Sequence, residues 1–348
     1  MATDSPTFGL WYDFRQRPPL GDYARLYAEC LEEIEEAEGL GYEGVWLSEH
    51  HFVDDGYLPS PLAVAAALAA RTKRMTIGTN VLLLPMHHPL RVAEDAAVAH
   101  LVSGGRFILG VGQGYVQHEF EVLGFNRRYR PSLFEEGVEI IRRAWEDGRI
   151  GYEGKRWRFE DLPFGPRLER RPLIYIGASA DPAIDRAARM ADGFLTSAAW
   201  GAGNILTYRK LREALARHGR ANADFPYVAS GVVYVREDSE RARSEVAPAI
   251  AYQRSRYAEW GTDRGRPKPE PCRGRGTSSA TPRRSQRASR GFTQRRPTTT
   301  SASGLVCRAS PTSRHSRVCA CSPLRWFPGS ATRWEGVKPV PEVWANDV

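Results

Sequence analysis

One carboxylate and two imidazoles stand in succession where an apolar run ends, near the beginning of the chain. Residues 45–47 are apolar, and they are followed after Ser48 by Glu49, His50 and His51. A short apolar run that stops in polar residues is typical of a buried strand, and histidine exchanges a proton near neutral pH without a shift in its pKa. The pattern indicates acid–base chemistry, with His50 and Glu49 as candidate catalytic residues. The structural alternative is a histidine that only hydrogen-bonds at a strand end, and we expect His51 to pack beside it.

The histidine doublets His50–His51 and His87–His88 also raise the question of a metal. Metal sites need ligands that converge in space with a fixed geometry. No spacing between histidines, cysteines and carboxylates in this chain resembles a standard ligand set. The sequence therefore predicts no metal site.

Strand and helix patterns alternate along the first 260 residues, and they are the elements that would position these side chains. The predicted strands are 8–12, 44–48, 75–84, 106–111, 173–176, 193–197 and 227–235, and the predicted helices are 22–39, 61–70, 90–102, 132–147, 181–190, 206–217 and 239–260. Strands separated by helices imply a parallel sheet with right-handed crossovers. Seven such units predict an α/β fold, a TIM-type (β/α) barrel whose chemistry lies at the carboxyl ends of the strands.

The last unit of an eight-fold barrel should follow Trp260, but the composition changes there. The chain has 49 Lys and Arg against 41 Asp and Glu, and residues 264–348 hold 17 of the former and 4 of the latter. This segment is rich in Arg, Ser, Thr, Pro and Gly, a composition that cannot bury enough apolar surface to offset chain entropy. We therefore expect a barrel domain over 1–262 and a disordered basic tail over 263–348 in place of the last βα unit.

Two interpretations of this tail compete. A basic arm would bind nucleic acid or another anionic surface. A shifted reading frame in a GC-rich gene would give the same excess of Arg, Ala, Pro, Ser and Gly with stray cysteines. We favour this second interpretation, and we therefore expect no nucleic-acid partner. The barrel segment holds one cysteine, Cys30, and therefore predicts no disulfide framework.

The chain contains no run of about 18 apolar residues, the length that a membrane span requires. Its first residues also lack the basic and then apolar pattern of a signal peptide. The sequence therefore predicts a soluble, cytoplasmic protein.

Six segments together resemble the bacterial luciferase-like monooxygenase family, over roughly residues 7–260. They are WLSEHHF (46–52), IGTNVL (77–82), HPLRVAED (88–95), SGGRFILGVG (103–112), PLIYIGAS (172–179) and ADGF (191–194). Each segment alone is weak, but their order and spacing are specific. The resemblance implies a (β/α) barrel that binds reduced FMN, or in some branches a reduced deazaflavin, at its carboxyl face.

The resemblance also implies an activity. We expect a flavin-dependent oxidoreductase, in first place a two-component monooxygenase that takes reduced FMN from a separate flavin reductase and uses molecular oxygen on a small organic substrate. A reduced-deazaflavin-dependent dehydrogenase or reductase is the alternative on the same fold, and an inactive truncated family member is an alternative of another class. Family members often dimerise through helices near the first strands, so a homodimer is a further expectation.

Site residues follow from the resemblance residue by residue. His50 matches the family's active-site histidine, and a non-proline cis peptide facing the flavin is expected at the Asn80–Val81 bond. A turn after the fourth strand is expected to approach the flavin ring, and a turn after the fifth strand, together with the N-terminus of the next helix, is expected to hold the flavin phosphate. The candidate cofactor-binding residues are Asn80, Val81, Gly112, Gln113, Tyr115, Gly177, Ala178 and Ser179.

Each of these assignments has a structural alternative. Residues 110–114 imitate a dinucleotide-binding loop, but position 115 is Tyr rather than the third glycine. The two turns could be turns without a ligand, Asn80 an ordinary buried residue, and Asp181 a plain helix cap before Pro182. Luciferase-type members carry an arginine where this chain has Gln113.

Overall fold

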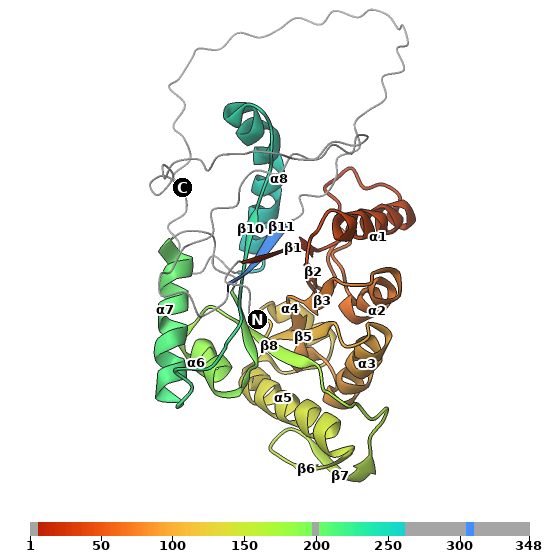
Figure 1. Ribbon diagram of the computed structural model, residues 1–348, viewed down its shortest axis with the longest axis vertical. Helices are drawn as coiled ribbons and strands as arrows, with labels where there is room; N and C mark the ends of the chain where they lie inside the picture. Colours follow the sequence, from red (N-terminus) through yellow and green to blue (C-terminus); the bar gives the residue numbers. More distant parts are fainter. Residues whose placement is uncertain (1–5, 197–201, 262–303, 310–348) are drawn as a thin grey trace, which may run out of the picture.

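A computed structural model describes residues 6–196, 202–261 and 304–309, and its central feature is a closed sheet surrounded by helices (Figure 1). The strands follow the order β3-β2-β1-β11-β10-β9-β8-β5-β4, and a further pairing of β3 with β5 closes the ring. All neighbouring pairs are parallel except the two that involve β11. The prediction of a TIM-type α/β barrel is confirmed.

The elements lie close to their predicted positions. The sheet contains β1 (Thr7–Tyr12), β2 (Gly44–Leu47), β3 (Thr76–Thr79), β4 (Leu82–Leu83), β5 (Phe107–Gly112), β8 (Leu173–Ala178), β9 (Gly193–Thr196), β10 (Tyr227–Val232) and β11 (Gly304–Ala309). The helices are α1 (Tyr23–Gly39), α2 (Pro61–Arg71), α3 (Pro89–Val102), α4 (Gln117–Val122), α5 (Arg130–Asp147), α6 (Asp181–Met190), α7 (Ala202–Arg217) and α8 (Ser239–Glu259), with short 3₁₀ turns η1 (Leu84–Met86) and η2 (Arg127–Tyr129). No helix in the described ranges combines the length and the hydropathy needed to cross a membrane.

Three differences from the predicted elements matter for the site. The expected third strand, 75–84, is broken into β3 and β4 at the Asn80–Val81 bond. The hairpin of β6 (Arg149–Glu153) and β7 (Arg158–Pro163) was not expected, because most of its residues are exposed and β7 lacks an apolar alternation. The six-residue helix α4, also unexpected, follows the glycine-rich turn after β5.

The place of the last barrel strand is taken by β11, which comes from the segment expected to be a disordered tail. It pairs antiparallel with β1 on one side and with β10 on the other. The expectation of a segment without regular structure is therefore wrong at residues 304–309. Within the described residues, no parallel strand followed by a helix completes the barrel; the remainder of the proposed tail lies outside them, so its disorder stays a prediction.

Local sequence signals explain where the helices begin and end. Asp22 caps α1 by accepting the amides of Ala24 and Arg25 at 2.9 and 3.3 Å. Pro61 occupies the first position of α2, where a missing N–H carries no penalty. The helix α5 ends at Gly148 with a φ of 63°, a left-handed conformation that glycine adopts without strain.

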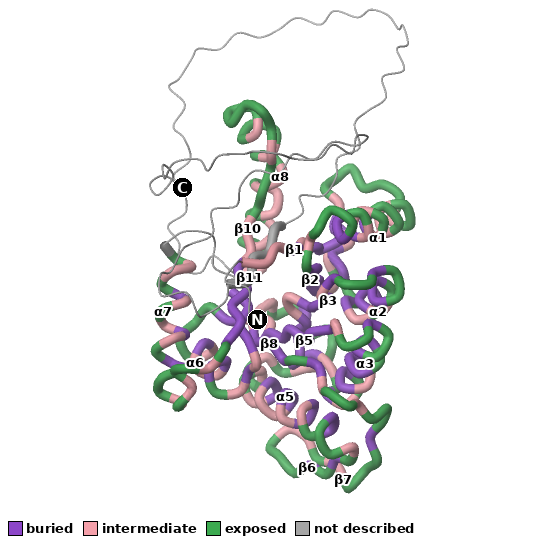
Figure 2. Tube along the Cα trace, in the orientation of Figure 1, coloured by how far each residue is buried: buried purple, intermediate pink, exposed green. Residues whose placement is uncertain are grey.

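Large rings fill the inside of the barrel and form the floor beneath the carboxyl ends. Trp46 of β2 and Tyr175 of β8 stack with ring centroids 6.0 Å apart, and Ile108, Leu195 and Val228 complete the cluster. Glycines opposite the rings make room for them: a Cβ on Gly78 would lie 2.5 Å from the ring of Trp46, and one on Gly193 would lie 2.6 Å from that of Tyr175. Figure 2 shows the burial concentrated on these strands and on the helix faces turned toward them.

Gly110 is the position where the barrel tolerates a side chain least. A Cβ there would lie 1.8 Å from the carbonyl oxygen of Thr79 and 2.6 Å from Leu195. Because the nearest atom is backbone of the neighbouring strand, we expect Gly110→Ala to lower the free energy of unfolding by about 1–3 kcal/mol or more. Chemical denaturation measures this, with Gly39→Ala as the control, since a Cβ on Gly39 meets nothing within 4 Å. Equal stability of the two variants would contradict the packing described.

Candidate functional site at the carboxyl end of the barrel

His50 lies just beyond β2, buried, with a partner on each ring nitrogen. Its Nδ1 is 2.8 Å from Oε1 of Glu119, and its Nε2 is 3.3 Å from the hydroxyl of Tyr115. Since a carboxylate can only accept, Nδ1 carries the proton, which leaves the lone pair on Nε2 directed toward Tyr115. The arrangement presents Nε2 as the atom that can take or give a proton.

Glu119 is the residue that orients His50, and sequence reasoning missed it. Its side chain is 1% exposed and comes from α4, 69 residues further along the chain. The same oxygen accepts the backbone N–H of His51 at 2.8 Å, while Oε2 has no hydrogen-bond partner among the described residues. In the sequence, Glu119 is visible only as a carboxylate next to Phe120. The helix α4 is too short for its apolar periodicity to show that Glu119 is buried.

Glu49, the other candidate catalytic residue, contacts neither ring nitrogen of His50, whose partners are Glu119 and Tyr115. Its Oε1 lies 3.0 Å from Nε2 of His51 and 2.8 Å from Nε2 of His87, and its Oε2 accepts the N–H of Leu83. Burial alone would raise the pKa of this carboxyl, but the hydrogen bonds and charges of the two imidazoles hold it at about 2. Glu49 is therefore an anion bound to His51 and His87, away from the ring of His50.

We expect Glu119→Gln to slow turnover about 10²-fold, the size of effect that a small misplacement of a reacting group produces. The amide keeps the size of the side chain but removes the charged acceptor that fixes the Nδ1 proton. Steady-state kinetics with the bound cofactor should show the loss in kcat rather than in KM, with partial rescue by Glu119→Asp. The matched control is Glu121→Gln, on the exposed side of the same helix; an equal effect of both variants would argue against the positioning role.

The Asn80–Val81 peptide bond is cis, as the family resemblance predicted. The amide of Asn80 donates to the carbonyl of Leu47 at 2.6 Å, and its own carbonyl accepts from Nε1 of Trp11 at 3.2 Å. The bond is thus held by the ends of β1 and β2 and faces the mouth of the barrel.

Three of the predicted cofactor residues contact one another. Val81 sits between two glycines from neighbouring strands, Gly112 at the end of β5 and Gly177 near the end of β8. A Cβ on Gly112 would lie 2.5 Å from Cγ2 of Val81, and a Cβ on Gly177 would lie 2.6 Å from its Cγ1. Only glycine fits on either side, so the two strands clamp Val81 in one place.

Gln113 and Tyr115 occupy the turn beyond β5. The Nε2 of Gln113 is buried and has no hydrogen-bond partner in the part of the chain that the structure describes. Tyr115 touches His50, its backbone carbonyl accepts from Arg127 at 2.8 Å, and burial raises the pKa of its hydroxyl well above the usual range. An unpaired buried amide in this turn suits a polar ligand edge, because a buried donor without a partner is costly.

The expected phosphate turn lies at the start of α6. Ala178 is buried at the end of β8 and Ser179 is exposed. The cap residue is Ala180 rather than Asp181, and no side chain caps the helix; Asp181 instead pairs with Nζ of Lys210 at 2.7 Å. A ten-residue helix whose first amides are not capped by a side chain can accept an anion.

The end of α8 covers His50 from above. None of the residues of α8 is fully buried, yet Trp260, directly after its last residue, lies against His50 with ring centroids 4.4 Å apart. Tyr257 approaches the same imidazole at 6.1 Å. These contacts join segments 200 residues apart, and the sequence gives no sign of them.

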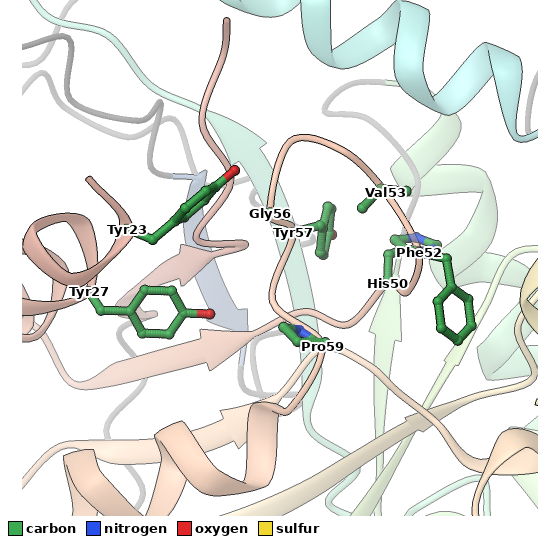
Figure 3. Close-up of a pocket in the computed structure, with 8 residues that line it drawn as sticks. All are labelled: Tyr23, Tyr27, His50, Phe52, Val53, Gly56, Tyr57 and Pro59. Carbon is green, nitrogen blue, oxygen red and sulfur yellow. The ribbon is translucent and has the colours of Figure 1, made fainter. Parts of the chain in front are cut away.

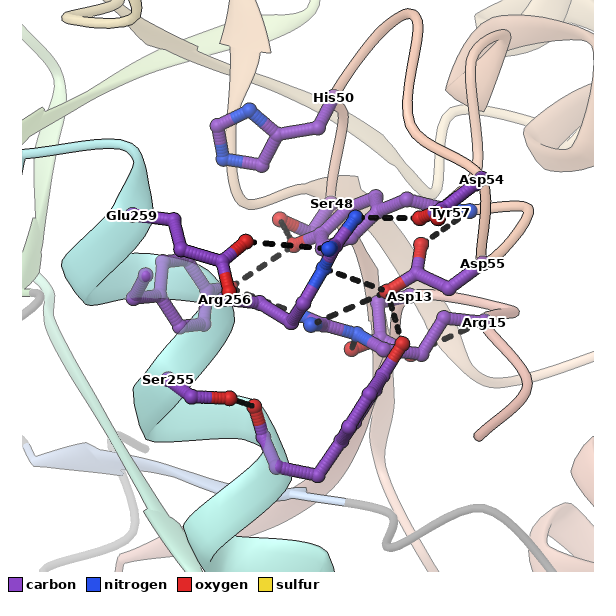
Figure 4. A network of polar contacts seen from close by, with 12 residues as sticks. Asp13, Arg15, Ser48, His50, Asp54, Asp55, Tyr57, Ser255, Arg256 and Glu259 are labelled. Carbon is purple, nitrogen blue, oxygen red and sulfur yellow. Dashed lines mark hydrogen bonds and ion pairs between the residues drawn. The ribbon is translucent and has the colours of Figure 1, made fainter. Parts of the chain in front are cut away.

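A buried network of charges ties this cover to β1 and to the loop after β2 (Figure 4). Nε of Arg15 donates to Asp13 at 2.6 Å, and its guanidinium lies 3.8 Å from Asp55 and 4.4 Å from the ring centroid of Tyr57. Burial raises the pKa of Asp13 and outweighs the attraction of Arg15. Arg15 also donates to the hydroxyl of Tyr257, so the network reaches α8.

A cavity of about 350 Å³ lies beside the loop after β2 (Figure 3). It is lined by Tyr23, Tyr27, His50, Phe52, Val53, Gly56, Tyr57 and Pro59. Of the predicted site residues it touches only His50, and the lining is otherwise apolar or aromatic. The cavity therefore suits an apolar molecule next to the imidazole rather than the flavin itself.

A closed (β/α) barrel that gathers His50, Glu119 and Val81 between its two glycines beyond the carboxyl ends of its strands has the architecture of barrel enzymes. The chain belongs to the luciferase-like monooxygenase family, whose model matches residues 7–303. The match extends past Trp260, where the resemblance seen in the sequence ended.

Named relatives fall into two groups. The chain is 36% identical to an F420-dependent glucose-6-phosphate dehydrogenase of Microbacterium testaceum over 46% of this chain and 50% of that protein. It is 30% identical to the alkanal monooxygenase beta chain of Photorhabdus luminescens over 64% of this chain and 70% of that one. The chain spans about half the length of the first curated relatives it matches.

Solved structures agree on the fold. Monooxygenase RslO1 from Streptomyces bottropensis superposes with a TM-score of 0.66 at 27% identity, over 74% of this chain and 80% of that one. The oxygenating constituent of 3,6-diketocamphane monooxygenase from Pseudomonas putida, in complex with FMN, gives a TM-score of 0.62 at 20% identity, over 73% and 74%. Among these relatives and structures, the names include both an F420-dependent dehydrogenase and a monooxygenase in complex with FMN.

Proposed function

We propose that the protein is a flavin-dependent monooxygenase that uses reduced FMN and molecular oxygen on a small organic substrate. The observation that carries the proposal is the site beside His50. There the buried, unpaired amide of Gln113 and the clamped Val81 lie at the mouth of one barrel, and they fit the edge and face of a flat polar ring. When bound there, a reduced flavin supplies the electrons that activate oxygen.

In this proposal the chain's own residues orient the flavin, transfer protons and exclude water from the site. Asn80, Val81, Gly112 and Gln113 would hold the ring, and Gly177, Ala178 and Ser179 with the N-terminus of α6 would hold the phosphate. Nε2 of His50 takes and returns a proton, since Nδ1 is committed to Glu119. Trp260 and Tyr257 keep bulk water from the imidazole.

A deazaflavin-dependent dehydrogenase is the second candidate, favoured by the identity to the F420-dependent glucose-6-phosphate dehydrogenase. The structural argument for FMN is the apolar cavity beside His50, which offers no cluster of charges for a sugar phosphate. The alkanal monooxygenase beta chain of Photorhabdus luminescens also aligns over more of this chain, 64%, than that dehydrogenase, which aligns over 46%. We further propose that the protein acts in the cytoplasm and receives its flavin from a separate reductase.

An anaerobic titration of the full chain with reduced FMN and with reduced F420 tests the proposal. We expect reduced FMN to bind at least about tenfold more tightly, a difference of 1.4 kcal/mol, and to raise the temperature of unfolding. Oxygen and a panel of aldehydes and ketones then identify oxygenated products. Exclusive binding of F420 would overturn the FMN assignment, and a chain whose cooperative unfolding neither cofactor shifts would be an inactive family member.

A further inference from the structure

Glu49, His51 and His87 form a second polar centre, which the flavin site does not use. One carboxylate oxygen, Oε1 of Glu49, lies 3.0 Å from Nε2 of His51 and 2.8 Å from Nε2 of His87. The three atoms all lie within 4.8 Å of one another. They come from the loop after β2 and from the turn after η1, so the fold brings together residues that no local spacing connects.

The geometry is close to that of a metal centre. In a tetrahedral zinc site with bonds of about 2.0–2.2 Å to nitrogen and oxygen, neighbouring ligand atoms stand about 3.3 Å apart. The nitrogen–oxygen distances here are a few tenths of an ångström shorter. A small outward movement of two imidazoles, one of them 30% exposed, would therefore admit an ion.

The surroundings of the cluster resemble those of a built site. Glu49 is fully buried, and its second oxygen accepts the backbone N–H of Leu83, which fixes the direction of Oε1. His51 and His87 are 12% and 30% exposed, so the cluster is open to solvent on the side of His87. The carboxylate of Glu49 is fixed by the backbone, and the two imidazoles lie toward solvent. This arrangement leaves an entry path for an ion and room for water as a further ligand.

We propose that Glu49, His51 and His87 bind one divalent transition-metal ion, with zinc as the ion that this ligand set fits. Two imidazoles and one carboxylate are a ligand set that zinc sites use, with water in the remaining position. The ion would tie the loop that carries His50 to the turn after β4. Its place is structural, because His50 directs its own nitrogens to Glu119 and Tyr115, away from the cluster.

Isothermal titration of chelator-treated full-length protein with Zn²⁺ tests this, followed by Co²⁺, whose visible absorption reports tetrahedral coordination. We expect one site per chain, lost or weakened at least about 100-fold in His87→Gln, which keeps an N–H for Glu49. His51→Ala should lose it as well. The matched control is His88→Ala, an exposed neighbour outside the cluster, which should bind like the wild type.

Two results would overturn the proposal: no zinc binding by the wild type, or binding of equal strength in His87→Gln. Circular dichroism of each variant separates loss of the site from loss of the fold. Binding of reduced FMN, measured on the same samples without metal, is independent of this outcome. The metal site and the proposed oxidoreductase function can therefore fail separately.

Discussion

Replacing His50 with alanine is expected to slow turnover by about 10²–10⁴-fold, the range that positioned acid–base groups contribute. The side chain is 5% exposed, one nitrogen is fixed by Glu119, and the other faces the mouth of the barrel beside Tyr115. No other imidazole among the described residues has this combination of contacts. Stopped-flow measurement of cofactor oxidation with a turned-over substrate gives the rate.

Two comparisons keep this result interpretable. His118→Ala removes an exposed imidazole on α4, the helix that carries Glu119, and should leave the rate unchanged. His50→Asn retains a polar group against Trp260, and thermal unfolding of both His50 variants shows whether packing has been lost. A full rate in stably folded His50→Ala would remove this residue from the chemistry.

Arg15→Met is expected to lower the free energy of unfolding by about 3–5 kcal/mol, because it strips the buried carboxylate of Asp13 of its cation, whereas Asp55 keeps Arg256 at 3.7 Å. Arg15 is 7% exposed and lies between Asp13 and Asp55, which are both buried. The guanidinium also donates to Tyr257, so its loss should loosen the cover over His50.

Chemical denaturation measures the change, and Arg25→Met is the matched control. Arg25 pairs with Glu29 on the exposed face of α1, where a salt bridge contributes little to stability. The double variant Arg15→Met with Asp13→Asn should recover part of the loss, since it removes the negative charge that Arg15→Met leaves unpaired. A loss in Arg15→Met as small as in Arg25→Met would mean that the network does not hold the carboxylates.

The barrel was predictable because each of its parallel strands is an apolar run followed by a helical pattern. The cis peptide at Asn80–Val81 was also predictable, but only through the family resemblance, whereas the break that it accompanies in the third strand was not predicted. The pairing of β11 with β1 and β10 was not predictable. A short strand in an Arg- and Ser-rich segment is stabilised by its neighbouring strands rather than by its own hydrophobic pattern. The choice between a basic arm and a shifted reading frame stays a prediction, as does the homodimer.

Within the site, the structure brings predicted residues together where they lie at the ends of neighbouring strands. Val81, Gly112 and Gly177 meet because the carboxyl ends of parallel strands share one edge of the barrel. Glu119 and Trp260 were missed because they reach His50 through a short helix and through the end of α8, contacts that only the fold creates. His87 was missed as a possible metal ligand for the same reason. Sequence spacing detects ligands within one segment, whereas the cluster of Glu49, His51 and His87 joins two segments.

We propose that the flavin ring lies against Val81 at the mouth of the barrel. The most direct test is the dissociation constant for reduced FMN, measured anaerobically for the wild type, Gly112→Ala and the control Gly39→Ala. A Cβ on Gly112 would push against Val81, which is β-branched and blocked by Gly177 on its other side. We predict that Gly112→Ala weakens binding by about tenfold or more, or 1.4 kcal/mol, while Gly39→Ala does not. Unchanged affinity in a correctly folded Gly112→Ala variant would place the cofactor elsewhere and contradict the account.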